Sequence, residues 1–363
     1  MQKKIRIISL ILAVWLIAGA IIALSACKDP QDDGDGEDDG GGEFDPYPYE
    51  DLSVFMDTPD YKNVTLSSEL VERMVNTELA YFYRDAKIDI PVYGASAKWD
   101  TVDISVTGFI DGGLEPELSG ENMLLVLGSD TFYIDGFEEG LIGLSSGEIK
   151  GLTLTFPTDY EGTAFAGKTV EYTVTVNAVY RAPVLTDDLC SEKTGFRSAA
   201  EYLEWVRKRC IFLYVWDGLT KKCVIKGYPD VEYAEYYQYL KGYFQTLAES
   251  EGMTFADFIS KYGGSYSEYG LFSGMTVLDF ENVATNYAKS NLVNDLLTYS
   301  IIRKEGIKTE GEEFEAAKAT LEKELMLPYS EIVKTSGKTE ALISVLSVRL
   351  CEVINGYVTV TNE

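Results

Sequence analysis

The chain contains no histidine among its 363 residues, and its charge is strongly one-sided. Its 31 basic residues are outnumbered by 59 acidic ones, which gives a formal net charge of −28. The absence of histidine excludes histidine-based catalytic triads and histidine-ligated zinc or haem. The shortage of positive charge argues against a nucleic-acid partner, because phosphate binding needs a basic surface. We therefore expect no metal or other cofactor and no nucleic-acid binding.

The N-terminus has the layout of a secretory signal. Three basic residues precede an apolar run over residues 7–24, and small residues then lead into Cys27. This layout is typical of a signal peptide, with the cysteine where bacterial lipoprotein signals carry the residue that is lipidated. An uncleaved transmembrane helix is the alternative, because about 18 apolar residues can just span a bilayer. We predict that residues 1–27 are a lipoprotein signal and that Cys27 anchors the chain to the outer face of the cell membrane.

Residues 28–57 are expected to form an acidic tether. Eleven acidic residues and no basic residue lie between positions 29 and 51. A segment with low hydrophobicity and many like charges cannot bury a core, so we predict a disordered, extended linker. The rest of the chain would then work outside the cytoplasm, held to the membrane through the lipid anchor.

Cysteine is otherwise scarce, and the four remaining residues do not have the C-x-x-C spacing of a metal site. They are Cys190, Cys210, Cys223 and Cys351. An extracytoplasmic chain permits one or two disulfides among them. Three of them lie in helical patterns, where a buried, small apolar role is the alternative. The sequence leaves the disulfide state open.

The periodicity of the apolar residues divides the rest of the chain. Residues 58–95 form a helical segment, with a helix predicted over residues 67–85. From residue 101 the period changes to two, and short runs at 102–110, 123–129, 150–156 and 169–180 are typical of an antiparallel sheet. After a boundary at 183–188 we predict helices at 198–223, 229–251, 254–262, 275–305, 310–327 and 338–354. A sheet module flanked by helices predicts an α+β fold rather than a repeated βαβ fold.

A set of short motifs runs in order through residues 99–181. They lie at 100–104, 107–108, 111–112, 127–129, 134–143, 146–148, 155–160, 166–168 and 171–174. Together they resemble the FKBP-type prolyl isomerase domain in the form found in trigger factor. The resemblance implies an FKBP-like antiparallel sheet module with a short helix over residues 96–182.

The second half also resembles trigger factor. Residues 183–188 are similar to the segment that leaves its isomerase domain, and residues 301–307 with 312–314 are similar to its helical arm. The resemblance implies that residues 183–363 form an all-helical chaperone domain of the trigger-factor or SurA type. The ribosome-binding domain of the family has no counterpart in this sequence, so we expect unfolded or secreted polypeptides as partners and no ribosome.

The resemblance also assigns a site. Ile134 would offer its backbone N–H to the substrate carbonyl, and Phe137 would form the floor of an apolar pocket. Tyr160 and Tyr172 would form its walls, and Val106 stands in the first strand where the family carries an aromatic residue. Such a pocket needs no cofactor, because desolvation of the amide and a twisted proline ring lower a rotation barrier of about 20 kcal/mol.

The sequence departs from the family beside this site. Residues 113–116 replace the family's Phe followed by Asp, and the segment 130–133, which ends in the expected substrate contact Tyr133, is one residue longer than usual. An active isomerase is therefore one interpretation, and a degenerate FKBP module is the other.

Aromatic residues in the second half suggest a surface for unfolded chains. They recur at helical spacing and include Tyr233, Tyr236, Tyr237, Tyr243 and Phe244. Such a stripe is typical of helix–helix packing, but tyrosines are also favoured at surfaces that bind other chains. We predict a membrane-anchored, extracytoplasmic foldase that combines prolyl isomerase and chaperone activity. The alternative is a holdase without catalytic activity.

Overall fold

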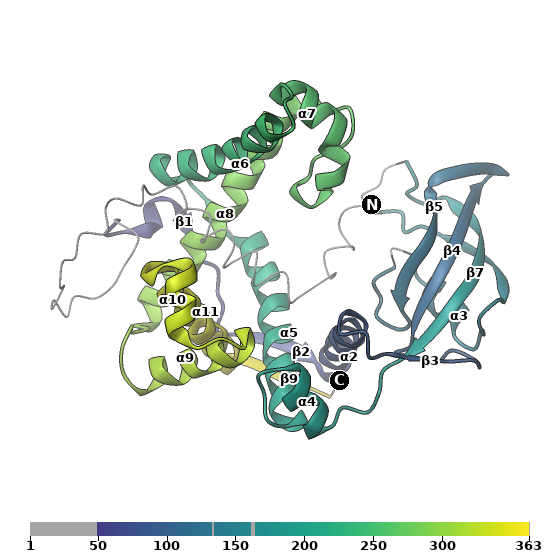
Figure 1. Cartoon of the computed structure of the whole chain (residues 1–363), viewed down its shortest axis with the longest axis horizontal. Coiled ribbons are helices and arrows are strands. Elements are labelled where there is room, and N and C mark those ends of the chain that lie inside the picture. Colours follow the sequence, from purple (N-terminus) through teal and green to yellow (C-terminus); the bar gives the residue numbers. More distant parts are fainter. Residues whose placement is uncertain (1–48, 133, 161–163, 363) are drawn as a thin grey trace. The chain divides into compact units, whose positions relative to one another are not determined.

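The computed structural model describes residues 49–132, 134–160 and 164–362 (Figure 1). The predicted signal with Cys27, residues 28–48 of the predicted tether, and Tyr133 lie outside the described residues. Residues 49–57 of that tether are described, and they contain a 3-10 turn and a short strand. Within the described ranges, no helix is both long enough and apolar enough to cross a membrane. The contacts divide the described residues into two compact units: one holds Thr65–Ile211 with residues 359–362, and the other holds Phe212–Val358 with residues 49–64.

The first unit contains an antiparallel sheet with the strand order β3-β7-β4-β5, in which β6 also pairs with β7. These strands are β3 (Ile90–Pro91), β4 (Thr101–Ile110), β5 (Gly113–Val126), β6 (Ile149–Thr155) and β7 (Thr169–Arg181). Alternate side chains along β4 and β7 are buried, as a period of two requires of a sheet with one face on a core. The turn between β4 and β5 places Asp111 and Gly112 at positive φ, which suits an Asp-Gly hairpin.

A short helix, α3 (Phe137–Leu141), packs on the sheet. It begins at Gly136, whose φ of 86° favours glycine. Gly140 lies so close to β6 that an added Cβ would be 2.5 Å from Cδ2 of Leu152. At one end of the sheet Asp100, just before β4, accepts two hydrogen bonds from the guanidinium of Arg181, at 2.8 and 2.6 Å. The sheet module is therefore held together by its own apolar core and by the ion pair between Asp100 and Arg181.

Three helices complete the first unit: α2 (Ser68–Asp85), α4 (Asp187–Lys193) and the first half of α5 (Ala199–Lys222). Phe82 and Tyr83 of α2 pack with Tyr202 and Val206 of α5 in one apolar cluster. The same unit holds a two-stranded ladder between β2 (Val64–Ser67) and β9 (Val358–Thr361).

The second unit is largely helical. Its elements are η2 (Leu52–Val54), α6 (Asp230–Ser250), α7 (Phe255–Tyr262), η3 (Gly263–Tyr269), α8 (Val277–Glu305), α9 (Glu312–Leu325), α10 (Tyr329–Ser336) and α11 (Lys338–Gly356), with a short ladder of β1 (Met56–Asp57) and β8 (Val224–Ile225). Phe244 and Phe280 join α6 to α8 in one core, and Phe314 joins α9 to α10 and α11 in another.

The predicted α+β fold is confirmed, and the long helices and three of the four main strands lie within a few residues of their predicted bounds. Four features differ from the prediction. The last residues of the segment predicted as a disordered tether form η2 and β1, because β1 pairs with β8. The remainder is largely rather than entirely helical, because β1, β2, β8 and β9 form short ladders, and the short helices α4 and α10 were not predicted. Strand β5 also begins ten residues earlier than expected and includes Pro116. Proline is tolerated there because β5 is at the edge of the sheet and pairs only with β4 among the described strands.

Candidate functional site

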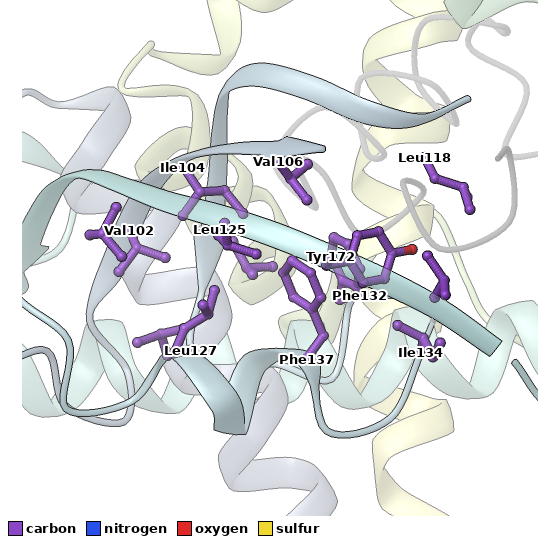
Figure 2. Packing of buried hydrophobic residues seen from close by; sticks show 14 of the residues in the cluster. Val102, Ile104, Val106, Leu118, Leu125, Leu127, Phe132, Ile134, Phe137 and Tyr172 are labelled. Carbon is purple, nitrogen blue, oxygen red and sulfur yellow. The ribbon is translucent and has the colours of Figure 1, made fainter. Parts of the chain in front are cut away.

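The predicted floor residue Phe137 is the first residue of α3, and its side chain is completely buried. Its ring lies flat against Phe132, with ring centroids 3.5 Å apart and an interplanar angle of 10°. Tyr172 of β7 meets Phe137 edge-on, at 5.2 Å and 86° (Figure 2). The three rings form the aromatic centre of the sheet module.

Two strands supply the predicted wall Tyr172 and Val106, the residue that stands where the family carries an aromatic one. Tyr172 on β7 and Val106 on β4 are both buried and belong to the same apolar cluster as Phe137. Gly108 makes this packing possible, because an added Cβ would be 3.0 Å from Cε1 of Tyr172 and 2.8 Å from Cβ of Leu118. A side chain at position 108 would push the Tyr172 ring or the β5 strand out of place.

Ile134 lies in the turn before α3 and is also buried. Its carbonyl accepts a hydrogen bond from the backbone N–H of Phe137, at 3.4 Å. This bond joins the turn to the start of the helix that carries the floor residue. The structure thus places Ile134 beside Phe137, while its role as a donor to a substrate carbonyl stays a prediction. Tyr133, the neighbouring predicted contact, lies outside the described residues.

Tyr160 lies in the loop between β6 and β7 and is half-buried. Its ring packs against Phe156, with centroids 4.8 Å apart, and burial raises the pKa of its hydroxyl. Its backbone N–H donates to the carbonyl of Pro157 at 3.1 Å, which fixes a tight turn. Tyr160 packs against the same apolar cluster as Phe137, so all the predicted pocket residues with described positions share one core.

Sequence reasoning missed two residues of this centre, Phe132 and Glu138. Phe132 is buried against Phe137, and the carboxylate of Glu138 accepts hydrogen bonds from the loop that carries Phe132. The longer segment 130–133 was the only signal for Phe132. Glu138 lies in the motif at 134–143, but the sequence did not indicate its contact with the loop, because an acidic residue in the first turn of a helix is ordinarily interpreted as a solvated partner of the helix dipole.

The aromatic stripe on α6 is divided between core and surface. Tyr236 and Phe244 are completely buried, and the hydroxyl of Tyr236 donates to the carboxylate of Asp295 at 2.6 Å. These two residues hold α6 against α8 and cannot contact a client in this arrangement, which corrects the prediction for them. Tyr233 and Tyr237 are half-buried, whereas Tyr243 is 39% exposed. The aromatic stripe of α6 is wider than the contact of α6 with α8, so the residues at its margins are partly exposed to solvent.

The four described cysteines carry free thiols. Cys190 and Cys210 are buried in the cluster of α2, α4 and α5, where burial raises the pKa of both thiols. Cys223 and Cys351 are half-buried, and burial raises the pKa of Cys223 to about 11. Among the residues with described positions, no three acidic, cysteine or histidine side chains gather closely enough to hold a metal ion.

Comparison with known proteins finds a family model that matches the sheet module and curated relatives that match more of the chain. Residues 94–177 match the family model for FKBP-type peptidyl-prolyl cis-trans isomerases. The trigger factor of Pelotomaculum thermopropionicum is 31% identical over 269 residues, which cover 70% of this chain and 59% of that protein. The trigger factor of Bacillus cytotoxicus is 27% identical over 304 residues, which cover 80% of this chain and 69% of that protein.

A solved trigger factor chaperone chain shares 15% identity with this protein over 84% of this chain and 71% of that chain, with a TM-score of 0.25. This chain spans between half and two thirds of the length of the first two curated relatives it matches, at 59% and 55%. The matched family segment contains β4, β5, β6, most of β7, α3 and the aromatic centre of Phe132, Phe137 and Tyr172. The sheet module is therefore an FKBP-type domain, and the chain that carries it is homologous to trigger factors.

Proposed function

We propose that this protein is a membrane-anchored foldase outside the cytoplasm, which isomerises X-Pro bonds and holds unfolded exported chains. The observation that carries the catalytic part is the convergence of Phe137, Tyr172, Val106 and Ile134 in one buried apolar centre within the FKBP-type domain. These residues come from α3, β7, β4 and the turn before α3.

Such a centre can catalyse rotation without a nucleophile. The barrier of about 20 kcal/mol comes from resonance in the amide, which water stabilises. An aromatic site removes that water and binds the twisted proline ring, while a backbone N–H binds the carbonyl oxygen. In this proposal Phe137 and Tyr172 supply the apolar surface, and Ile134 supplies the N–H.

The test is a protease-coupled assay with a short peptide that contains one proline, run on the full-length chain in detergent. We expect the protein to accelerate isomerisation, and we expect Phe137→Leu, which keeps an apolar side chain, to lower the rate at least about tenfold. Equal rates for both proteins, at equal melting temperatures, would remove Phe137 from the site.

The second candidate is a holdase with a catalytically inactive sheet module. Its support is that the floor is completely buried and that Leu114, in the segment that replaces the family's Phe and Asp, is 56% exposed on β5. A protein that suppresses aggregation of an unfolded client but never accelerates isomerisation would favour this candidate.

Exposed apolar residues on the helical unit support client binding. Tyr243 is 39% exposed on α6, Phe272 is 51% exposed after η3, and Leu278 is 68% exposed at the start of α8. Apolar and aromatic contacts of this kind hold unfolded chains weakly and are little affected by salt. We propose that clients bind there, and we expect suppression of aggregation to persist at high salt.

The location is proposed from the N-terminal sequence alone. Residues 1–27 read as a lipoprotein signal, and only the thiol of Cys27 can form the thioether to lipid in that reading. Cells grown with a fatty-acid probe provide the test. Cys27→Ser should abolish the label on the protein, and equal labelling of both proteins would contradict the anchor.

A further inference from the structure

The described structure leaves no open face on the floor of the candidate site. Phe137, Ile134 and Tyr172 are at most 2% exposed. A proline ring can reach Phe137 only if a neighbouring side chain moves away. Tyr172 stands on the central strand β7, which is paired on both sides and therefore resists movement.

Phe132 is the neighbour that can move. It lies between β5 and α3, outside any helix or strand, and its ring covers one face of Phe137 at a centroid distance of 3.5 Å. Aromatic pairs favour offset or edge-on contacts over this face-to-face arrangement, so the contact with Phe137 is a weak one for two phenyl rings. Phe132 also meets Tyr172 edge-on, at a longer centroid distance of 6.2 Å. If a proline ring binds against this face of Phe137, as the proposed function requires, the ring of Phe132 lies in its place.

One carboxylate holds the loop of Phe132. We call residues 129–132 the clasp loop. The backbone N–H groups of Asp130, Thr131 and Phe132 donate to Glu138, at 2.9, 2.8 and 2.9 Å. The hydroxyl of Ser129 adds a fourth bond at 3.2 Å. Bonds to a buried carboxylate are strong, but because they end on a single side chain, the clasp loop can open without disturbing the sheet.

Helix α2 also contacts the clasp loop. Arg73 pairs with Asp130 at 3.1 Å, and the side chain of Tyr81 lies beside Thr131. Helix α2 lies outside the segment that matches the FKBP family, yet it belongs to the same compact unit. An element beyond the isomerase module therefore stabilises the position of Phe132.

We propose that Phe132 occupies the substrate's proline position in the free protein and must leave Phe137 before an X-Pro segment can bind. Arg73 and Tyr81 of α2 favour the occupied position and so reduce access to the site. The proposal rests on the isomerase function proposed above and adds the residue that limits substrate entry. When only a fraction of molecules has an accessible site, the apparent dissociation constant is the intrinsic constant divided by that fraction.

The experiment measures binding of a fluorescently labelled peptide with one proline to the full-length chain in detergent, together with the isomerase rate. If the accessible state is about a tenth of the population, Phe132→Ala should tighten binding about tenfold. We also expect kcat/KM to rise, mainly because KM falls while kcat changes little. A substitution that only loosened the core would not lower KM in this way. Arg73→Ala and Tyr81→Phe should act in the same direction with smaller effects.

Phe196→Ala is the matched control, because Phe196 is as buried as Phe132, at 5% exposed, but packs among α2, α4 and α5. It should leave peptide binding unchanged. Phe132→Leu, a smaller change, replaces Phe132→Ala if the latter does not fold, and should also tighten binding.

Two other outcomes overturn the proposal in different ways. In the first, the wild-type protein is active and the folded Phe132 variant binds the peptide more weakly or equally well. Phe132 would then be part of the pocket wall and would not limit entry, and the isomerase function would still hold. If neither wild type nor variant binds or isomerises any peptide, the isomerase function itself fails, and the proposal for Phe132 fails with it.

Discussion

The sheet module and helix α6 both carry aromatic residues that the sequence marks as functional, but they arrange them in opposite ways. In the sheet module the residues come from separate elements, α3, β7 and β4, and converge on one buried centre. On α6 they come from one helix, and they diverge between a buried seam with α8 and the solvent. Convergence suits recognition of one proline ring, whereas divergence suits weak contact with many chain segments.

The largest effect is expected from a substitution of Phe137, the floor residue of the sheet module, compared with the same substitution in the helical unit. Phe137→Ala should lower the isomerase rate at least about tenfold and destabilise the module by about 3–5 kcal/mol, because a buried ring is lost. Phe280→Ala is the matched change in the other region, since Phe280 on α8 is equally buried.

Phe280→Ala should destabilise the helical unit by a similar amount while the rate of the folded protein stays normal. The isomerase rate and the melting temperature should be measured for both variants and for the wild type. If both variants reduce the rate equally, the sheet module is not the catalytic part.

The second prediction concerns a carboxyl group that is buried on α2. Glu78 of α2 is 5% exposed, and burial raises its pKa to about 7, although Arg209 lowers it. The folded protein therefore binds a proton at Glu78 that the unfolded chain releases near its ordinary pKa of 4.5. Stability from this group is complete below pH 4.5 and is lost as the pH rises through 7.

Glu78→Gln should thus raise the free energy of unfolding by up to about 3 kcal/mol at pH 8 and change it little at pH 4.5. Denaturant titrations of the variant and wild type at the two pH values provide the measurement. Glu69→Gln, an exposed change on the same helix, is the control and should stay within about 0.5 kcal/mol. A gain that does not depend on pH would contradict the assignment to Glu78.

The sequence predicted much of the fold because local patterns set it. Alternation in residues 102–110 and the long helical period of residues 275–305 correspond closely to β4 and α8. Strand β5 was predicted to start too late, because Pro116 and Gly120 interrupt its apolar alternation at the sheet edge. Phe132 and Glu138 were missed because their contact joins a loop to a helix, and loop conformation depends on tertiary packing rather than on periodicity.

The third prediction sharpens the division of the α6 stripe. Tyr236→Phe removes the hydroxyl that donates to Asp295 and should cost about 1.5–3 kcal/mol of stability, as expected for a buried bond to a carboxylate. Tyr243→Ala should leave the melting temperature nearly unchanged and weaken client binding a few-fold, because Tyr243 is 39% exposed. Aggregation of an unfolded client, measured by light scattering at low and high salt, separates the two variants. Stronger loss of client binding with Tyr236→Phe would reverse the assignment.

The smallest expected effect concerns Tyr160. This residue packs on the core of the sheet module, like Phe137, but it lies in a loop and is only half-buried, like the margins of the α6 stripe. Its ring contacts Phe156, at a centroid distance of 4.8 Å, so the aromatic ring is held although the residue is only half-buried. If the ring alone matters, Tyr160→Phe keeps full activity and Tyr160→Ala lowers kcat/KM a few-fold, or about 1 kcal/mol of transition-state stabilisation. If the hydroxyl binds the substrate, both variants lose activity equally. Full activity in both variants would show that the wall assigned to Tyr160 does not touch the substrate, and the site would then consist of Phe137, Tyr172 and the residues that cover them.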